Sequence, residues 1–311
     1  MADRVLVFGE ALLDDFDDQS IPGGAPFNVA RNLAALGARP LMVTRVGNDA
    51  GGAVLEREFT RFGMSTEGLQ HGDEPTGRVT VERDGAGGHR FHILAGQAYD
   101  HIEPAETVDV TRAFSPNTVY FGTLAQREPE SRAALKAVLE SVPDAGRFLD
   151  LNLRDGVEES VVFASLQQAG TVKVNELELQ ALFSWYCHTC PDTVDMDCAA
   201  VETEARALMH NFSIRGLLVT LGRRGAMFLG ADGARVTDPG VPQPQLADTV
   251  GAGDAFAAVF MLGQARGWDM PLTLQRANAF AAAVCGFAGA VAPDAQFYAQ
   301  WRAAWGLQLP A

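Results

Sequence analysis

The segment from Asp248 to Phe256, Asp-Thr-Val-Gly-Ala-Gly-Asp-Ala-Phe, joins a glycine turn to an apolar, alanine-rich stretch. Gly251, Ala252 and Gly253 have little or no side chain, so their backbone N–H groups can come close to an anion of phosphate size. The dipole of the predicted helix favours the negative charge. Asp254 lies in the first turn of that helix, where a carboxylate can take a proton from a hydroxyl that attacks phosphorus. An acidic helix start after an ordinary glycine turn has the same local pattern, so other parts of the chain must distinguish the two.

A second glycine motif, Gly23-Gly24-Ala-Pro-Phe-Asn-Val-Ala, lies near the N-terminus. Its two glycines let the backbone approach a ligand, and Pro26 suits the start of a helix. The side-chain amide of Asn28 offers a donor and an acceptor, which are the contacts that a sugar hydroxyl needs. Asp14 follows the first predicted strand, so its carboxylate can accept hydrogen bonds from adjacent sugar hydroxyls, although an acidic residue after a strand is more often a turn residue.

The composition is that of a globular protein with a large core, because 47% of the 311 residues are apolar. No apolar run approaches the roughly 20 residues that a membrane-spanning helix needs, and Val5 to Gly9 is too short for a signal sequence. We therefore expect a cytoplasmic protein without a membrane partner. A formal net charge of −15 repels polyanions, so we also expect no nucleic-acid partner.

Four cysteines are too few for a disulfide scaffold. Three of them cluster as Cys187, Cys190 and Cys198, and His188 lies between the first two. A zinc or redox site is one interpretation of this cluster. No second Cys-x-x-Cys pair is present, however, and the segment has the character of a surface insertion after a helix, so we expect free thiols in a loop.

Apolar runs of strand length alternate with helical patterns along most of the chain. This alternation is typical of α/β proteins with a doubly wound, mostly parallel central sheet and helices on both faces. In such sheets ligands bind beyond the C-terminal ends of the strands. The expected strands are Val5 to Gly9, Leu41 to Val46, Val119 to Phe121, Phe148 to Leu151, Thr171 to Val174 and Leu217 to Thr220, and the expected helices include Phe27 to Leu36, Glu130 to Leu139 and Leu272 to Phe287.

Residues 76 to 93 interrupt this pattern. Two alternating segments, Gly77 to Arg83 and His89 to Ile93, are joined by the glycine-rich residues 84 to 88. Such a sequence predicts a β-hairpin rather than a strand followed by a helix.

We therefore expect two parts, an α/β nucleotide- and substrate-binding domain of residues 1–75 and 94–311 and a small β lid of residues 76–93. Leu12 to Phe16 can add a strand to the same small sheet. A hairpin that projects from an α/β domain can close over a substrate and exclude water. A surface hairpin without a functional role is the alternative.

Taken together, these motifs closely resemble those of the PfkB, or ribokinase-like, family of carbohydrate kinases, and within it the fructokinase-like members. The resemblance extends from about Val5 to Val291 with the motifs in the family's order, and joint order and spacing are far more specific than any single motif. The segments that carry it are Gly23-Gly24 with Asn28-Val-Ala30, Asp150-Leu-Asn152-Leu-Arg154, Lys173-Val-Asn175-Glu-Leu-Glu178, Thr220-Leu-Gly222, Asp248 to Asp254, Asn278 and Gly289-Ala290.

The resemblance implies an ATP- and Mg²⁺-dependent kinase whose base is Asp254 and whose anion hole is the backbone from Gly251 to Asp254. The residues that it places near the sugar are Asp14, Gly24 and Asn28, with Arg154 near the sugar or the phosphates. The residues that it places near the nucleotide are Asn175, Thr220, Gly222 and Asn278. For metals, it implies that Glu178 orders Mg²⁺ through water and that Asp248 takes part in binding a monovalent cation such as K⁺.

Several of these residues have an ordinary structural alternative. Asn175 and Asp248 are both residue types that cap helix N-termini. Thr220 and Gly222 can simply end a strand and begin a turn.

The resemblance implies that the substrate is a sugar with a primary hydroxyl, and fructose is the sugar that we expect. A sugar acid such as 2-keto-3-deoxygluconate, or a nucleoside, is the alternative within the class, and a sugar acid would need a cation that Arg154 or Arg90 can supply. An alternative of another class is a non-catalytic sugar sensor with the kinase fold. The intact base and anion hole argue against a sensor, which would be free to lose either.

The resemblance also implies a homodimer, because the lids of two subunits often cover each other in related kinases. The expected hairpin has alternating apolar residues at Val79, Val81, Phe91 and Ile93. An apolar face and open sheet edges favour pairing with another chain.

Overall fold

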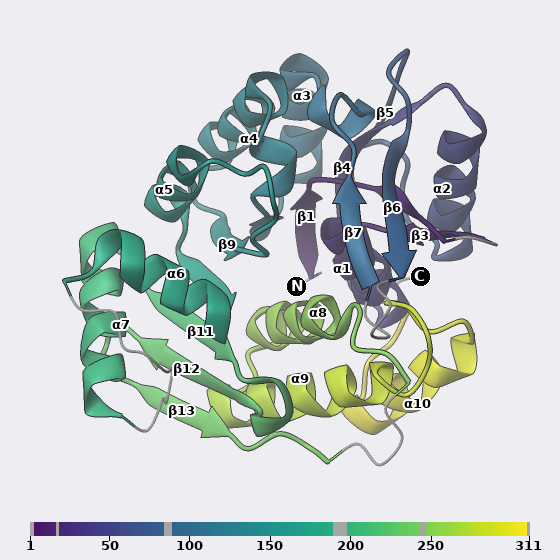
Figure 1. The fold of residues 1–311 in the computed structure, drawn as a ribbon. Helices are drawn as coiled ribbons and strands as arrows, with labels where there is room; N and C mark the ends of the chain where they lie inside the picture. Colours follow the sequence, from purple (N-terminus) through teal and green to yellow (C-terminus); the bar gives the residue numbers. More distant parts are fainter. Residues whose placement is uncertain (1–2, 17–18, 84–88, 189–197, 243–246, 310–311) are drawn as a thin grey trace.

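The computed structural model describes residues 3–309 except 17–18, 84–88, 189–197 and 243–246, and for residues 81–83 and 89–91 it describes the backbone alone. Figure 1 shows an α/β body with a smaller sheet on one side. In this described part of the chain, no helix is both long enough and apolar enough to cross a bilayer.

The strands of the central sheet are β1 (Arg4–Phe8), β4 (Arg39–Gly47), β5 (Leu69–Gly72), β8 (Thr118–Phe121), β9 (Gly146–Asp150), β10 (Thr171–Asn175), β11 (Gly216–Thr220), β12 (Ala226–Gly230) and β13 (Arg235–Asp238). Among the described residues these nine strands lie in the order β13-β12-β11-β10-β9-β8-β1-β4-β5. The strands from β11 to β5 are parallel, whereas β12 is antiparallel to both of its neighbours. Strand order reverses at β1, and ligands bind at such switch points in open α/β sheets.

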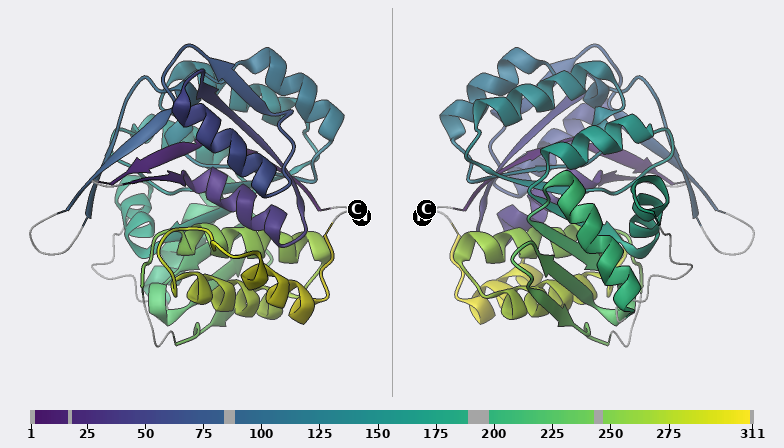
Figure 2. Two further views of the ribbon diagram at one scale, coloured as in Figure 1. Left: turned by 90° about the vertical axis from the view of Figure 1, so that its right-hand side faces the viewer. Right: turned by 90° about the vertical axis from the view of Figure 1, so that its left-hand side faces the viewer.

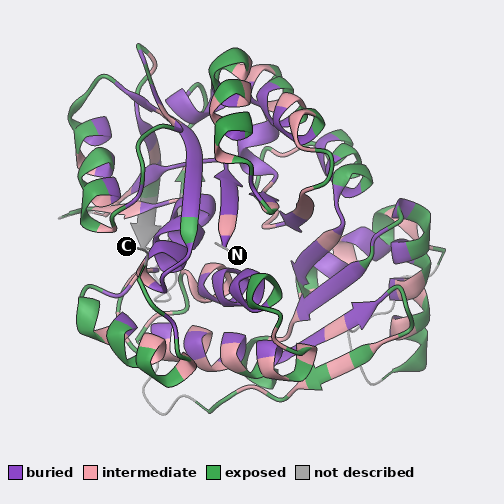
Figure 3. Ribbon diagram, turned by 180° about the vertical axis from the view of Figure 1, so that it is seen from behind, coloured by how far each residue is buried: buried purple, intermediate pink, exposed green. Residues whose placement is uncertain are grey.

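Helices cover both faces of this sheet. One layer consists of α1 (Ala25–Ala35), α2 (Ala50–Arg61), α8 (Ala252–Arg266), α9 (Met270–Val284) and α10 (Ala295–Trp305), and the other of α3 (Pro104–Phe114), α4 (Pro129–Ser141), α5 (Glu159–Gln168), α6 (Glu176–Tyr186) and α7 (Ala199–Phe212). Strand β1 shows why both layers are needed. Val5 and Val7 pack against the first layer while Leu6 and Phe8 pack against the second, because successive side chains in a strand point to opposite faces. Figure 3 shows the central strands largely buried.

The smaller sheet consists of β2 (Leu12–Asp15), β3 (Ser20–Gly23), β6 (Gly77–Arg83) and β7 (His89–Ile93). Within the described residues these four strands lie in the order β3-β2-β6-β7. Strand β2 runs parallel to β6, and the β2–β3 and β6–β7 pairs are antiparallel. Figure 2 shows β6 and β7 extending away from the α/β body.

The structure confirms the predicted fold class, and the six expected strands of the central sheet are all present. The strands β3, β5, β12 and β13 were not expected. Three of them are four residues long, as in Leu69–Gly72 and Arg235–Asp238, and their mixed apolar and polar residues carry no clear period. Such short segments become strands because a neighbouring strand edge supplies their hydrogen-bond partners.

Candidate active site

The N-terminus of α8 forms the tight turn that the glycine motif predicts. Gly251 is the N-cap, with φ 77°, a left-handed conformation that favours glycine. A Cβ at this position would also collide with Ala290. Gly253 and Asp254 follow in the first turn, where backbone N–H groups have no helical carbonyl to bind. These N–H groups and the positive end of the helix dipole suit an anion.

Asp254 presents its carboxylate at this turn. Its Oδ2 accepts a hydrogen bond from Nδ2 of Asn28 at 2.7 Å, which joins α8 to α1. Burial raises the pKa of Asp254 to about 6, while the hydrogen bond from Asn28 and the charge of Lys173 oppose the rise. A carboxylate with this pKa is still ionised at neutral pH and is a better proton acceptor than an ordinary Asp.

Asn28 is held by Arg31, which lies three residues further along α1. Nη2 of Arg31 donates to Oδ1 of Asn28 at 2.6 Å, and Nη1 forms an ion pair with Glu58 at 3.0 Å. We expected Asn28 to contact a sugar, but its Oδ1 and one hydrogen of its Nδ2 are already used by protein groups. The other Nδ2 hydrogen makes no hydrogen bond with a described residue. The sequence did not indicate this role of Arg31, because it shows only a basic residue within an apolar helix pattern.

A buried ion pair lies beside the anion-binding turn. Nζ of Lys173 on β10 contacts both carboxylate oxygens of Asp150 on β9, at 2.8 and 2.9 Å. Burial alone would lower the pKa of Lys173, but Asp150 and Glu178 outweigh that effect and raise it, so the ammonium stays charged. Nζ lies only 3.3 Å from the position that a Cβ on Gly253 would take. The sequence contained a signal for this pair, a Lys and an Asp near the ends of two apolar strands, to which we assigned no role.

Asp14 lies on β2, beside the second glycine motif. A Cβ at Gly23 would collide with the carboxylate of Asp14, so this glycine makes room for the acidic side chain. Gly24 has φ 98° and turns the chain into α1. Burial raises the pKa of Asp14 to about 6, and the charges of Arg154 and Arg31 oppose the rise.

Glu10 is an acidic residue of this region to which we had assigned no role. It follows β1, is 3% exposed, and its Oε2 has no hydrogen-bond partner among the described residues. Burial raises the pKa of Glu10 to about 7. Together with Asp14, Asp254 and Glu178 it makes four carboxyl groups whose pKa burial raises, and such groups concentrate at functional sites.

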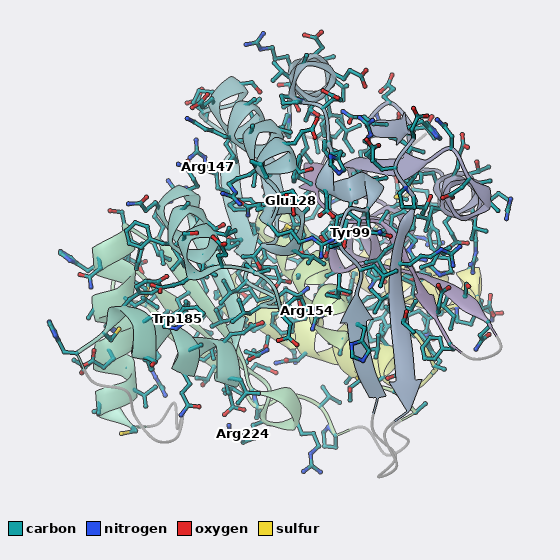
Figure 4. The ribbon with its side chains drawn as sticks, turned by 45° about the horizontal axis from the view of Figure 1, so that its top comes forward. Tyr99, Glu128, Arg147, Arg154, Trp185 and Arg224 are labelled. Atoms are coloured by element: carbon teal, nitrogen blue, oxygen red, sulfur yellow. The ribbon has the colours of Figure 1, made fainter. Side chains whose placement is uncertain are left out.

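Arg154 lies on the loop after β9 and is exposed. Its positive charge lowers the pKa of Glu10, of Asp14 and of Asp254, so it lies within electrostatic reach of all three carboxyl groups. In the view of Figure 4, Arg154 lies in the middle of the molecule, between Tyr99 and Trp185. An exposed cation in this position can approach an anionic substrate group or a phosphate.

Two of the residues expected at a nucleotide site, Asn175 and Thr220, lie in one row across the end of the sheet. Asn175 pairs with Thr220, Thr220 with Ala226, and Ala226 with Asp238. Asp238 then accepts a hydrogen bond from Nδ2 of Asn278 at 2.5 Å. The structure thus brings Asn175, Thr220 and Asn278 to the same end of the sheet, with the amide of Asn278 already bound to Asp238.

Asn175 and Glu178 form a reciprocal capping box at the start of α6. Oδ1 of Asn175 accepts from the N–H of Glu178 at 2.9 Å, and Oε2 of Glu178 accepts from the N–H of Asn175 at 2.8 Å. Oε1 of Glu178 accepts from the N–H of Leu153 at 2.9 Å. The N-cap alternative for Asn175 is therefore correct. Gly222 has φ 56°, and a Cβ there would meet nothing within 4 Å, so a ligand has room to approach this turn.

Asp248 connects two turns near α8. Its Oδ1 accepts from the N–H of Val250 at 3.0 Å, and its Oδ2 accepts from the N–H of Gly289 at 3.2 Å. The N-cap alternative for Asp248 is wrong for α8, because that position is occupied by Gly251.

The cysteine cluster lies partly outside the described residues, which do not include Cys190. Cys198 is exposed, and Sγ of Cys187 donates to the carbonyl of Glu204 at 3.8 Å. Within the described part of the chain, no group of three or more His, Cys, Asp and Glu residues is arranged to hold a metal ion.

Comparison with known proteins gives a family assignment for the chain. Residues 4–296 match the pfkB family of carbohydrate kinases. A probable fructokinase-4 of Arabidopsis thaliana is 28% identical over 283 residues, which cover 83% of this chain and 81% of the relative.

Solved structures show the same fold. The fructokinase with bound ATP from Xylella fastidiosa matches with a TM-score of 0.81 at 21% identity, over 98% of this chain and 100% of that one. The fructokinase from Vibrio cholerae O395 with fructose, ADP and a calcium ion matches with a TM-score of 0.74 at 24% identity, over 96% and 98% of the two chains. Because the family match extends over nearly the whole chain, the protein belongs to the pfkB family of carbohydrate kinases.

Proposed function

We propose that this kinase transfers the γ-phosphoryl group of ATP to a primary hydroxyl of a sugar, and that the sugar is fructose. The observation that carries the proposal is the arrangement at α8, where Asp254 lies in the first turn beside Lys173 and accepts a hydrogen bond from Asn28. The proposed base, Asp254, and the positively charged Lys173 beside the anion-binding turn therefore lie together. The fructokinase names of the relatives, one of them solved with fructose, support the choice of sugar.

In the proposed reaction, Asp254 takes the proton of the sugar hydroxyl as its oxygen attacks the γ-phosphorus in line. The bond from phosphorus to the bridging oxygen breaks, and ADP leaves with the electron pair. The N–H groups of Gly251, Gly253 and Asp254 and the ammonium of Lys173 stabilise the charge on the transferred group, whereas the N–H of Ala252 donates to the carbonyl of Thr249 at 3.3 Å. The proton ends on the carboxylate of Asp254.

The residues around the turn also fit the expected ligands. Each oxygen of Glu178 accepts one backbone hydrogen bond, and a carboxylate oxygen can accept more than one. Glu178 can therefore hold a water of Mg²⁺, which when bound neutralises phosphate charge. Each oxygen of Asp248 likewise accepts one backbone hydrogen bond and can still coordinate a K⁺ ion. Thr220 and Gly222 would contact the nucleotide directly. Asn278 would act indirectly, by holding the side chain of Asp238, to which its amide donates.

The proposed sugar site consists of Asp14, Gly24, Asn28 and Arg154. Asp14 and Asn28 offer an acceptor and a donor for hydroxyls. The exposed guanidinium of Arg154 lies within electrostatic reach of Glu10, Asp14 and Asp254. Because this cation can pair with a substrate carboxylate, it favours one second candidate, a sugar acid such as 2-keto-3-deoxygluconate.

A coupled ADP-release screen tests the proposal across ketohexoses, aldohexoses, sugar acids and nucleosides. We expect the highest kcat/KM for fructose, because the carboxylate of Asp14 and the amide of Asn28 offer an acceptor and a donor for sugar hydroxyls. The Asp254→Asn variant, purified in the same way, controls for contaminating kinases. A higher kcat/KM for a sugar acid would replace fructose by that substrate, and no turnover with any sugar would contradict the proposed function.

The activity is expected to fall at acid pH with a midpoint near 6. Burial raises the pKa of Asp254 from 3.8 to about 6, and only the ionised carboxylate accepts a proton. The value of kcat/KM for the sugar is therefore full above this pKa and decreases at least tenfold per pH unit below it, because Asp14 in the proposed sugar site also has a pKa of about 6. Measurement from pH 5 to 8.5 with saturating ATP checks this, with circular dichroism at each pH as the control for folding. Full activity at pH 5 would show that no base with a raised pKa limits the reaction.

We also propose that the smaller sheet is a lid and that two subunits meet through it. Val79 of β6 is 4% exposed and lies opposite Asp14 in the register of β2 with β6, so the hairpin and the sugar site share one strand pair. Leu94, directly after β7, is 42% exposed. Strands β3 and β7 are the edges of the sheet, and open edges favour pairing. Val81 and Phe91 belong to the residues described by their backbone alone.

Shortening the hairpin tests the lid and the dimer together. Replacing residues 82–90 by Asn-Gly keeps Val79 opposite Asp14 and is expected to give a monomer with a higher KM for the sugar and more ATP hydrolysis, since water is no longer excluded. Light scattering and separate assays of sugar phosphate and ADP measure these effects. A monomeric wild-type protein at micromolar concentration would rule out the dimer, and a normal sugar KM in the shortened variant would rule out the lid.

A further inference from the structure

Arg31 is a buried arginine whose guanidinium contacts three elements around the proposed base. Nη2 donates to Oδ1 of Asn28 on α1 at 2.6 Å and to the carbonyl of Pro22 on β3 at 2.9 Å, and Nη1 donates to Glu58 on α2 at 3.0 Å. The guanidinium carbon lies 4.5 Å from the ring centre of Phe27. With 3% of its surface exposed, Arg31 is not a solvated surface charge, and packing fixes its contacts.

These contacts decide which way the amide of Asn28 points. A guanidinium group only donates hydrogen bonds, and an ionised carboxylate only accepts them. Because Arg31 takes Oδ1 of Asn28, the Nδ2 group has to face Asp254, which it contacts at 2.7 Å. Without the guanidinium the amide is free to turn over, and Asp254 then loses its donor in a fraction of the molecules.

We infer that Arg31 is a positioning residue, which acts through Asn28 to hold the carboxylate of Asp254 in the orientation that accepts the sugar proton. The inference rests on the proposed role of Asp254 as the base. Arg31 also binds Pro22, which lies opposite Leu13 in the strand pair that carries Asp14. One guanidinium thus connects the sugar-side strands to the base, and a displacement of about 1 Å in such geometry can cost about 10²-fold in rate.

The same contacts affect the pH at which the base is active. Burial raises the pKa of Asp254, and the hydrogen bond from Asn28 opposes this rise. If the amide no longer donates, the pKa of Asp254 rises further and the acid limb of kcat/KM moves to higher pH. The other titratable groups that face Asp254 are Glu10, Asp14, Tyr120, Asp150, Arg154 and Lys173. Among them Asp14 also responds to the loss of Arg31, because the charge of Arg31 lowers its pKa. The acid limb of kcat at saturating sugar is therefore measured beside that of kcat/KM, since Asp14 acts on sugar binding and Asp254 on the transfer step.

The decisive variant removes Arg31 together with its buried counterion. Arg31→Met alone leaves Glu58 without its partner, and breaking one side of a buried ion pair is strongly destabilising. Arg31→Met combined with Glu58→Met removes both charges. We expect kcat of this double variant to fall about 10²-fold at pH 7, with little change in the KM for ATP and with the acid limb of kcat/KM moved to higher pH.

Two further variants serve as controls. Arg61 pairs with the same Glu58 at 3.1 Å, but its side chain is 47% exposed, so Arg61→Met should leave kcat and the pH profile unchanged. Arg31→Lys keeps the positive charge without the planar fork that spans Asn28, Pro22 and Glu58. It is expected to recover part of the lost kcat.

The outcomes separate a positioning role from a structural one. A double variant that folds and turns over at the wild-type rate, with an unmoved acid limb, would show that Arg31 serves stability alone and would overturn the inference. Lower kcat with a shifted acid limb would support it. A wild-type enzyme that phosphorylates no sugar in the screen would instead contradict the proposed function, so the two failures are distinguishable.

Discussion

Asp254→Asn is expected to lower kcat by about 10²–10⁴-fold, because a positioned general base contributes this much to rate. The substitution keeps the shape of the side chain and an oxygen that can accept the hydrogen bond from Nδ2 of Asn28, which now binds Oδ2 at 2.7 Å. The variant should therefore fold normally. Steady-state kinetics with the best sugar of the screen, at saturating ATP, measures the loss.

Binding is expected to survive this substitution, because the change affects a proton transfer rather than the contacts of the ground state. Calorimetric titration with the sugar and with an ATP analogue checks that both still bind. The part of the acid limb that belongs to Asp254 should disappear in the variant, and any limb that remains near pH 6 belongs to another group such as Asp14, whose pKa burial also raises to about 6. Near-full turnover would remove Asp254 from the mechanism, and with it the proposed basis of the pH profile.

The parts of the site that could be predicted from the sequence are those built from neighbouring residues. The turn at Gly251 to Asp254 is one example, because φ 77° at the N-cap and a helix start are properties of a short segment. The hairpin strands Gly77–Arg83 and His89–Ile93 are another, since alternation and a glycine-rich connection are local signals. In both cases the pattern and the physical constraint lie within about ten residues.

The contacts between these segments could not be predicted in the same way. Asn28 and Asp254 are 226 residues apart, and nothing in either motif states that one donates to the other. The role of Arg31 depends on Glu58 and on Pro22, which three separate elements bring together only in the folded chain. We recognised the residue types that do chemistry more readily than those that orient them, because orientation is a property of packing.

The ion pair of Lys173 with Asp150 could be predicted in part. Each residue stands in a motif that we had noted, and their strands pair directly in the sheet. A charged residue inside an apolar strand requires a partner when it is buried. The sequence therefore indicates that Lys173 is paired, but only the strand order identifies Asp150 as the partner and Gly253 as the neighbour.

Gly253→Val is expected to abolish measurable turnover while leaving the protein folded. Gly253 lies inside α8 and has no left-handed backbone conformation, so the helix itself accepts a side chain. Its Cβ would lie 3.3 Å from Nζ of Lys173, in the space between the first-turn N–H groups and the ammonium. The methyl groups of Val would occupy the proposed phosphate position and keep the transferred group from its donors. Loss of one such donor alone costs about 10²–10³-fold in kcat, so loss of the whole contact should cost more.

Matched glycine variants separate the two possible causes of inactivity. Gly253→Ala adds a single methyl group and is expected to keep part of the turnover, whereas Gly251→Ala collides with Ala290 and forces φ 77° on a residue with a Cβ, so it should lower the melting temperature. For Gly253→Val we expect a melting temperature at or above that of the wild type, because Gly is a poor helix former. A stable Gly253→Val variant with unchanged kcat/KM for ATP would show that the turn is structural and that the phosphate binds elsewhere. A stable but inactive variant would place the transferred phosphoryl group against the first turn of α8, between Lys173 and Asp254.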